Sequence, residues 1–103
     1  MTTEFTEDIK IDEKIKKKVI HPKKYNVVML NDEVTPMDWV MTVLKDIYKH
    51  SEATAEELTM RIHHEQSAVV GTYAFEIAEQ KALETVNSSR NHGFPLTVKI
   101  DEV

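Results

Sequence analysis

The chain has 103 residues, enough for one domain with a single hydrophobic core and too few for a second. It contains no cysteine, which excludes disulfides, thiolate nucleophiles and cysteine-ligated metals and gives no sign of an oxidising compartment. The first residues are acidic and polar, unlike a signal peptide, and no apolar run could span a bilayer. We therefore expect a cytosolic protein that does not associate with membranes.

The formal net charge of −5 is unevenly distributed along the chain. Residues 1–24 hold seven of the thirteen lysines and arginines, whereas residues 25–103 hold thirteen of the eighteen acids. An acidic folded body repels a phosphate backbone, so nucleic acid is not expected as a ligand. Charged segments that are poor in aromatic residues seldom order on their own. We therefore expect residues 1–22 to form a flexible N-terminal extension and residues 23–103 to form the folded domain.

The first predicted element is a strand over residues 25–30, which are mostly β-branched or apolar and are followed by a loop-forming Asn-Asp pair. A helix is predicted to begin just after it, with Thr35 as the N-cap, Pro36 in the first helical position and Asp38 completing a capping box. The apolar residues of this helix recur at three-to-four spacing and indicate one buried stripe, formed by Val40, Val43, Leu44 and Ile47.

The remaining elements follow in alternation. A second helix is predicted from Ser51 to about residue 64, with Ala55, Leu58 and Ile62 inward, and then a short strand over residues 67–70 that Gly71 breaks. A third helix is expected from residue 75 to about residue 92, ended by Gly93 in a left-handed conformation, with an apolar face of Ile77, Ala78, Ala82 and Val86. A half-buried strand over residues 96–100 closes the chain. This order predicts an α+β fold with a three-stranded antiparallel sheet and three helices packed on it.

Enzymatic function is not supported. With two glycines, the chain has no glycine-rich phosphate loop, and no serine lies in a recognisable nucleophile motif. The adjacent histidines of His63-His64-Glu65 lack the four-residue spacing of a metalloprotease helix. A metal site built from Asp32, His63 and His92 is formally possible, but an isolated histidine is more often structural. We therefore predict no catalytic residue, no metal and no cofactor.

Several motifs follow one another from residue 25 onward: Tyr25-Asn26-Val27-Val28-Met29-Leu30-Asn31-Asp32, Thr35-Pro36-Met37, Ile62-His63-His64-Glu65, Ala68-Val69-Val70-Gly71, Glu76-Ile77-Ala78-Glu79-Gln80-Lys81 and Gly93-Phe94-Pro95-Leu96. In combination they resemble the ClpS family of adaptor proteins. The motifs occur in the order typical of the family and near its spacing. The resemblance covers nearly all of residues 25–103, whereas the N-terminal extension shows no residue-level match.

The resemblance implies an adaptor that binds N-degrons, proteins whose first residue is Leu, Phe, Tyr or Trp. Such adaptors deliver these substrates to a Clp AAA+ unfoldase, of the ClpA or ClpC type, that works with the ClpP peptidase. By family correspondence, Asn31, Asp32 and His63 bind the free α-amino group. The first side chain would enter an apolar pocket of Thr35, Met37, Val40, Thr59, Ile62 and Leu96. Glu76 and Lys81 would dock the unfoldase.

Three positions depart from the family pattern. Thr59 replaces a usual methionine of the pocket, Gln66 replaces a common glycine after the histidine motif, and Ala74 occupies the usual Ser/Thr cap of the third helix. Two other hypotheses stay open: a domain of this fold that regulates the unfoldase without binding N-degrons, and a metal-dependent hydrolase. We expect a monomer.

Overall fold

The computed structural model describes residues 23–103; the predicted extension, residues 1–22, lies outside the described residues. The elements are β1 (Tyr25–Leu30), α2 (Met37–Asp46), α3 (Glu52–Glu65), β2 (Ser67–Tyr73), α4 (Phe75–Asn91) and β3 (Thr97–Glu102). The three strands form one antiparallel sheet in the order β2-β1-β3. The α+β fold predicted from the sequence is therefore confirmed. No helix within the described residues is both long and apolar enough to cross a membrane.

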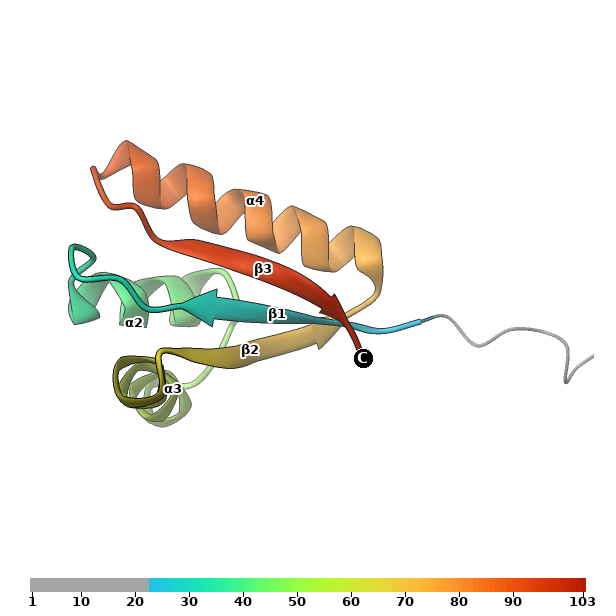
Figure 1. Cartoon of the computed structure of the whole chain (residues 1–103), viewed down its shortest axis with the longest axis horizontal. Coiled ribbons are helices and arrows are strands. Elements are labelled where there is room, and N and C mark those ends of the chain that lie inside the picture. The colour runs from blue at the N-terminus through green and yellow to red at the C-terminus, as the bar shows by residue number, and fades with distance from the viewer. Residues whose placement is uncertain (1–22) are drawn as a thin grey trace, which may run out of the picture.

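The core lies between the sheet and the helices. In Figure 1, α4 runs along β3, α2 lies behind β1, and α3 lies at the end of the sheet where β2 begins. All four apolar residues predicted for the stripe of α2 are buried, as are the three predicted inner residues of α3. They pack against the fully buried Val27 and Met29 of the central strand.

Gly71 does not break β2, so the predicted end of this strand is wrong. The strand continues to Tyr73, and the register shifts at Gly71: Val27 pairs with Gly71, but Val28 pairs with Val69. A Cβ atom at position 71 would collide with the ring of Tyr73. Gly71 is therefore required by a β-bulge and by the close approach of an aromatic ring, not by a turn.

The predicted apolar face of α4 is also partly wrong. Ala78 is fully buried, but Ile77 is 46% exposed, and the other buried residues of the helix are Thr85 and Ser89. Their hydroxyls pair with α2 and the residues that follow it: Thr85 Oγ1 lies 2.8 Å from the Tyr48 hydroxyl, and the Trp39 indole N–H donates to Ser89 Oγ at 2.8 Å. Apolar periodicity cannot predict such a face, because it counts Thr and Ser as polar even where their hydroxyls are buried and hydrogen-bonded.

The two ends of α4 differ in how well they are capped. Gly93 has φ +82°, as predicted for a left-handed stop, and the N–H of Phe94 donates to the carbonyl of Ser89 at 2.8 Å. At the N-terminus, Ala74 occupies the N-cap and makes no side-chain hydrogen bond to the helix. The N-cap of α3 does have such a bond, because Ser51 Oγ accepts from the N–H of Thr54 at 3.2 Å.

Candidate functional site

The carboxylate of Asp32 organises the loop between β1 and α2. Its Oδ1 accepts hydrogen bonds from the N–H groups of Val34 at 2.8 Å and Thr35 at 2.7 Å, and its Oδ2 accepts from the Thr35 hydroxyl at 2.7 Å. The predicted cap is therefore wrong: Thr35 bonds to Asp32, and Pro36 occupies the N-cap of α2 without a side-chain bond. Residues with short polar side chains often make such turns when they precede a helix.

Hydrogen bonding favours the ionised form of Asp32. Partial burial by itself would raise the pKa of this carboxyl, but the hydrogen bonds donated by Thr35 and Val34 outweigh it and lower the pKa below its ordinary value. At neutral pH the loop therefore presents a fixed negative charge. A carboxylate has about four lone-pair sites, and residues 23–103 supply three donors, so within this part of the chain one position on Oδ2 is open to a further donor.

Asn31 lies directly after β1 and is held by Gln66. Its backbone N–H donates to the Gln66 carbonyl at 2.9 Å, and its side-chain Nδ2 donates to Gln66 Oε1 at 3.4 Å. With the amide nitrogen engaged, the side-chain oxygen accepts no hydrogen bond from the described part of the chain. Asn31 can therefore offer this oxygen to an external donor.

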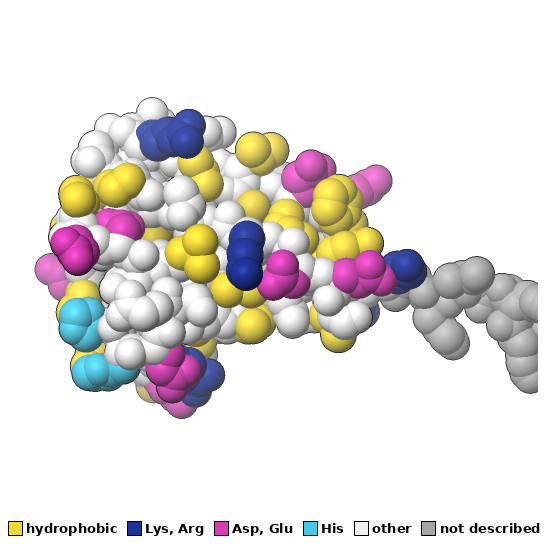
Figure 2. Space-filling view, in the orientation of Figure 1, with side chains coloured by type: hydrophobic (Ala, Val, Ile, Leu, Met, Phe, Trp, Pro, Cys, Tyr) yellow, Lys and Arg dark blue, Asp and Glu magenta, His cyan; other side chains and the backbone are white. Residues whose placement is uncertain are grey.

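His63 lies in the last turn of α3 with an exposed side chain, 5.3 Å from the ring of His64. Its carbonyl accepts from Gln66 Nε2 at 3.3 Å. Asn31 and His63 therefore lie at the same end of the molecule, because both are hydrogen-bonded to Gln66. Figure 2 shows histidine and acidic side chains together at that end, where the loop after β1 and the end of α3 meet in Figure 1.

The residues predicted for the apolar pocket fall into two groups. Val40, Thr59, Ile62 and Leu96 are buried, whereas Thr35 is half-buried and Met37 is 39% exposed. Val40, Ile62 and Leu96 belong to one contiguous core cluster, and Met37 is the first residue of α2. The Thr59 hydroxyl donates to the Ala55 carbonyl at 2.7 Å, so its polar atom is already satisfied.

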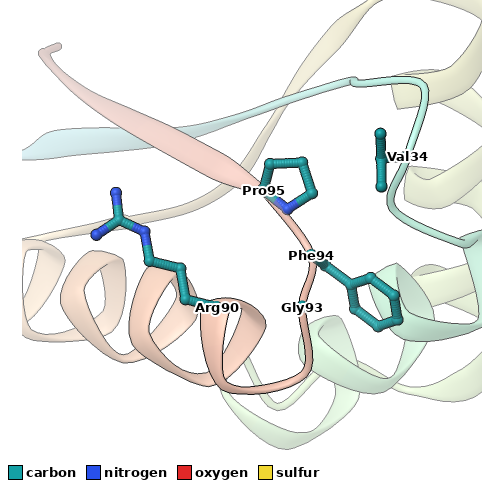
Figure 3. A pocket seen from close by; sticks show the side chains of 5 residues that line it. All are labelled: Val34, Arg90, Gly93, Phe94 and Pro95. Carbon is teal, nitrogen blue, oxygen red and sulfur yellow. The ribbon is translucent and has the colours of Figure 1, made fainter.

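A hollow of about 400 Å³ lies next to this region (Figure 3) and is lined by Val34, Arg90, Gly93, Phe94 and Pro95. Its lining includes none of the predicted pocket residues, although Val34 precedes Thr35 and Pro95 precedes Leu96 in the chain. Figure 3 shows Val34 on the opposite side from Pro95, with the Arg90 guanidinium directed away from Phe94. Gly93, Phe94 and Pro95 belong to one of the motifs of the family resemblance, but no binding role was predicted for them, and the lining also takes residues from the loop before α2 and the end of α4.

The two residues predicted to dock an unfoldase have different surroundings. Glu76 is exposed in the first turn of α4. Lys81 is half-buried: its ammonium group donates to the carbonyl of Ile47 at 2.7 Å and lies 5.9 Å and 5.4 Å from the ring centroids of Tyr48 and Tyr73. Lys81 is therefore held by contacts within the fold and does not lie on a fully solvated helix face. The docking role of both residues stays a prediction.

The trio considered for a metal does not form a site. Within residues 23–103, no three His, Asp or Glu side chains are grouped closely enough to hold an ion. His92 follows α4 and lies on Trp39 at a ring-centroid distance of 4.3 Å, and its Nδ1 lies 2.9 Å from the Ser88 carbonyl. His92 therefore contacts residues of both α2 and α4.

Comparison with known proteins agrees with this architecture. The family model for the ATP-dependent Clp protease adaptor protein ClpS matches residues 20–99. A ClpS protein of Treponema denticola is 39% identical over 89 residues, which cover 86% of this chain and 88% of that protein. A ClpS protein of Shewanella piezotolerans is 34% identical over 98 residues, covering 94% of this chain and 96% of the relative.

A solved structure is similar as well. Agrobacterium tumefaciens ClpS2 bound to L-phenylalaninamide superposes with a TM-score of 0.78 at 38% identity, covering 81% of this chain and all of that one. The family model and these relatives match far more than half of the chain, in the region where the fold and the polar cluster lie. The chain therefore belongs to the ClpS family of adaptor proteins of the ATP-dependent Clp protease.

Proposed function

We propose that this adaptor works in the cytoplasm and binds the free α-amino group and the large hydrophobic first residue of N-degron substrates. It then delivers them to a Clp AAA+ unfoldase, of the ClpA or ClpC type, coupled to ClpP. The observation that carries the proposal is that Asn31 and Asp32 follow β1 and that Asn31 is joined through Gln66 to the last turn of α3, which holds His63. The similar ClpS2 protein bound to L-phenylalaninamide, a ligand with a free amine and an aromatic side chain, supports the same assignment.

The chemistry of an α-amino group matches the acceptors that Asn31, Asp32 and His63 offer. The group is mostly protonated at neutral pH, with an ordinary pKa near about 8, and then presents three N–H donors and a positive charge. The Asn31 side-chain oxygen and a neutral His63 ring nitrogen are two acceptors, and Asp32 supplies the charge together with its remaining position on Oδ2. An internal peptide amide has one N–H and no charge, so the site distinguishes chain termini from chain interiors.

The apolar residues beside this cluster account for the choice of first side chain. Val40, Ile62 and Leu96 belong to the buried core cluster, and Met37, the first residue of α2, is 39% exposed. Burying a Leu or Phe side chain against these residues contributes about 2–3 kcal/mol of binding free energy. The unbranched Met37 side chain would crowd a substrate residue that is branched at Cβ, so we expect Leu, Phe, Tyr and Trp to bind and Ile and Val to be rejected.

A pair of peptides tests the proposal. A fluorescently labelled peptide with N-terminal Phe should raise its anisotropy on titration with the protein, whereas the same peptide with an acetylated N-terminus should not bind. Acetylation removes the charge and two of the three donors and leaves the side chain unchanged. Equal binding of the two peptides would show that the α-amino group is not recognised.

Delivery needs a second assay. A folded fluorescent reporter with N-terminal Phe should be degraded by a Clp unfoldase with ClpP faster in the presence of the adaptor than in its absence. A chain that binds neither peptide but changes the degradation of other substrates would instead be a regulator of the unfoldase. Capture of the free-amine peptide without faster degradation would contradict the delivery step alone.

A further inference from the structure

Gln66 has a backbone conformation that its side chain does not favour. It is the C-cap of α3 with φ +75° and ψ −12°, in the left-handed region where glycine is the usual residue. Its N–H donates to the Ile62 carbonyl at 2.9 Å, and its own carbonyl accepts from the N–H of Asn31 at 2.9 Å. Both backbone bonds would form equally well with glycine, so they do not explain why this position holds glutamine.

The side chain of Gln66 makes two further hydrogen bonds, and each connects it to a residue of the amine cluster. Its Nε2 donates to the carbonyl of His63 at 3.3 Å, and its Oε1 accepts from Nδ2 of Asn31 at 3.4 Å. The first bond fixes which end of the Gln66 amide faces α3. The oxygen is consequently turned toward Asn31, where it accepts from the amide nitrogen of that side chain.

This arrangement determines which end of the Asn31 amide is free. An asparagine amide has an acceptor at one end and two donors at the other, and a rotation about its last torsion exchanges them. With Nδ2 held by Gln66, the Asn31 oxygen is the end available to a ligand. In the exchanged orientation an NH₂ group would face the ammonium ion, and the favourable contact would become a repulsive one.

Resting on the function proposed above, we propose that Gln66 is a positioning residue: its side chain orients the Asn31 amide so that an oxygen meets the α-amino group of the substrate. Gln66 itself need not touch the ligand. The two side-chain bonds are long and solvent-exposed, so we expect a moderate effect: loss of this side chain should weaken binding of the free-amine peptide by about threefold to tenfold.

Two variants separate the side chain from the backbone. Gln66→Gly removes both side-chain bonds and suits the positive φ, whereas Gln66→Ala removes the same bonds and keeps an unfavourable backbone. We expect both to lose affinity for the N-terminal Phe peptide to the same extent, while the melting temperature of the glycine variant exceeds that of the alanine variant. If affinity falls only in the alanine variant, the effect follows stability, and the role of the side chain is overturned.

A second background tests whether Gln66 acts through Asn31. In Asn31→Asp the side chain has two acceptor oxygens and no amide to orient, so adding Gln66→Gly to it should change affinity less than twofold. The side-chain amide resonances of Asn31 in an ¹⁵N-correlated NMR spectrum of the ligand-free protein should also shift in both Gln66 variants. Equal losses in the wild-type and the Asn31→Asp backgrounds, or unshifted Asn31 resonances, would overturn the proposal.

The same experiments distinguish the positioning role from the proposed function. A wild-type protein that prefers the free-amine peptide, with Gln66 variants that bind it equally well, would overturn the positioning role and leave the proposed function intact. A wild-type protein that does not distinguish the free-amine peptide from its acetylated twin would overturn both.

Discussion

Removing the carboxylate of Asp32 should damage both the fold and the binding site. In Asp32→Ala, the N–H groups of Val34 and Thr35 and the Thr35 hydroxyl lose their acceptor together. At about 0.5–1.5 kcal/mol net for each bond, and with water partly replacing them, we expect a loss of about 2 kcal/mol in the free energy of unfolding. For a domain of this size that corresponds to a fall of about 10 °C in the melting temperature.

The effect on binding is of similar size but has another cause. The ammonium group of the ligand loses its only anionic partner in the proposed site, which should cost about 2 kcal/mol or about 30-fold in affinity for the N-terminal Phe peptide. Asp32→Asn separates the two effects. It keeps an oxygen for the two backbone N–H groups, so most of the stability should return, but it lacks the charge, so most of the affinity should not.

Glu33 provides the matched control. It carries the same charge on the next residue, its side chain is exposed, and it makes no hydrogen bond or ion pair within the described residues. Glu33→Ala should therefore change neither the melting temperature nor the affinity by much. The assays are thermal unfolding followed by circular dichroism and peptide titration by anisotropy. An Asp32→Ala variant that behaves like Glu33→Ala in both would refute this account of the loop.

Further predictions concern pH, stability and selectivity. Because the pKa of Asp32 is lowered in the folded state, its ionised carboxylate contributes stability above the ordinary carboxyl range, and this contribution is lost as pH falls through the lowered pKa. The difference in melting temperature between wild type and Asp32→Ala should therefore narrow from pH 7 to about pH 2. Lys81→Met should cost about 2 kcal/mol in chemical denaturation, because the Ile47 carbonyl loses a charged donor, whereas Glu76→Gln should be neutral. Ala74→Ser should add about 1 kcal/mol by capping α4, and unchanged stability would contradict this. In peptide titrations, Met37→Ala should bind peptides with N-terminal Ile or Val, and Thr59→Met should shift the preference from Tyr toward Leu. An unchanged order of peptide affinities would show that these residues do not shape the pocket.

Lys81 shows why the stability measurement matters for function. Its substitution would remove a predicted docking residue and also break an internal contact between α4 and the end of α2. Loss of delivery in Lys81→Met would therefore not by itself identify a docking surface. Glu76 offers the cleaner test, because its exposed side chain can be changed with the fold intact.

The parts of the fold predicted from the sequence are those that depend on local signals. The apolar stripe of α2, the strand of residues 25–30 and the left-handed stop at Gly93 follow from spacing and backbone preference, and the structure confirms them. The errors occur where a particular side-chain contact or strand pairing, not the spacing of residue types, determines the local structure. Gly71 accommodates a bulge and the Tyr73 ring, and Thr35 bonds to Asp32 instead of capping a helix.

In the candidate site, too, the types of residue could be predicted from the sequence, but the contacts between them could not. The types of residue in the amine cluster came from the sequence and from its family resemblance, whereas their connection through Gln66 did not. The Asn31–Gln66 bond joins residues 35 positions apart, and nothing in local spacing predicts it. The buried hydroxyls of Thr85 and Ser89 were missed for a related reason, since their partners Tyr48 and Trp39 lie in another part of the chain.

The most direct test of the amine site is an NMR titration of the full chain with L-phenylalaninamide, with N-acetyl-L-phenylalaninamide as the control. We predict saturable shifts for the side-chain amide of Asn31, the backbone N–H groups of Val34 and Thr35, and the methyl groups of Ile62 and Leu96, and none of these with the acetylated compound. Shifts that instead centre on the hollow beside Phe94, or that are equal for the two compounds, would contradict the claim that this adaptor recognises a free α-amino group.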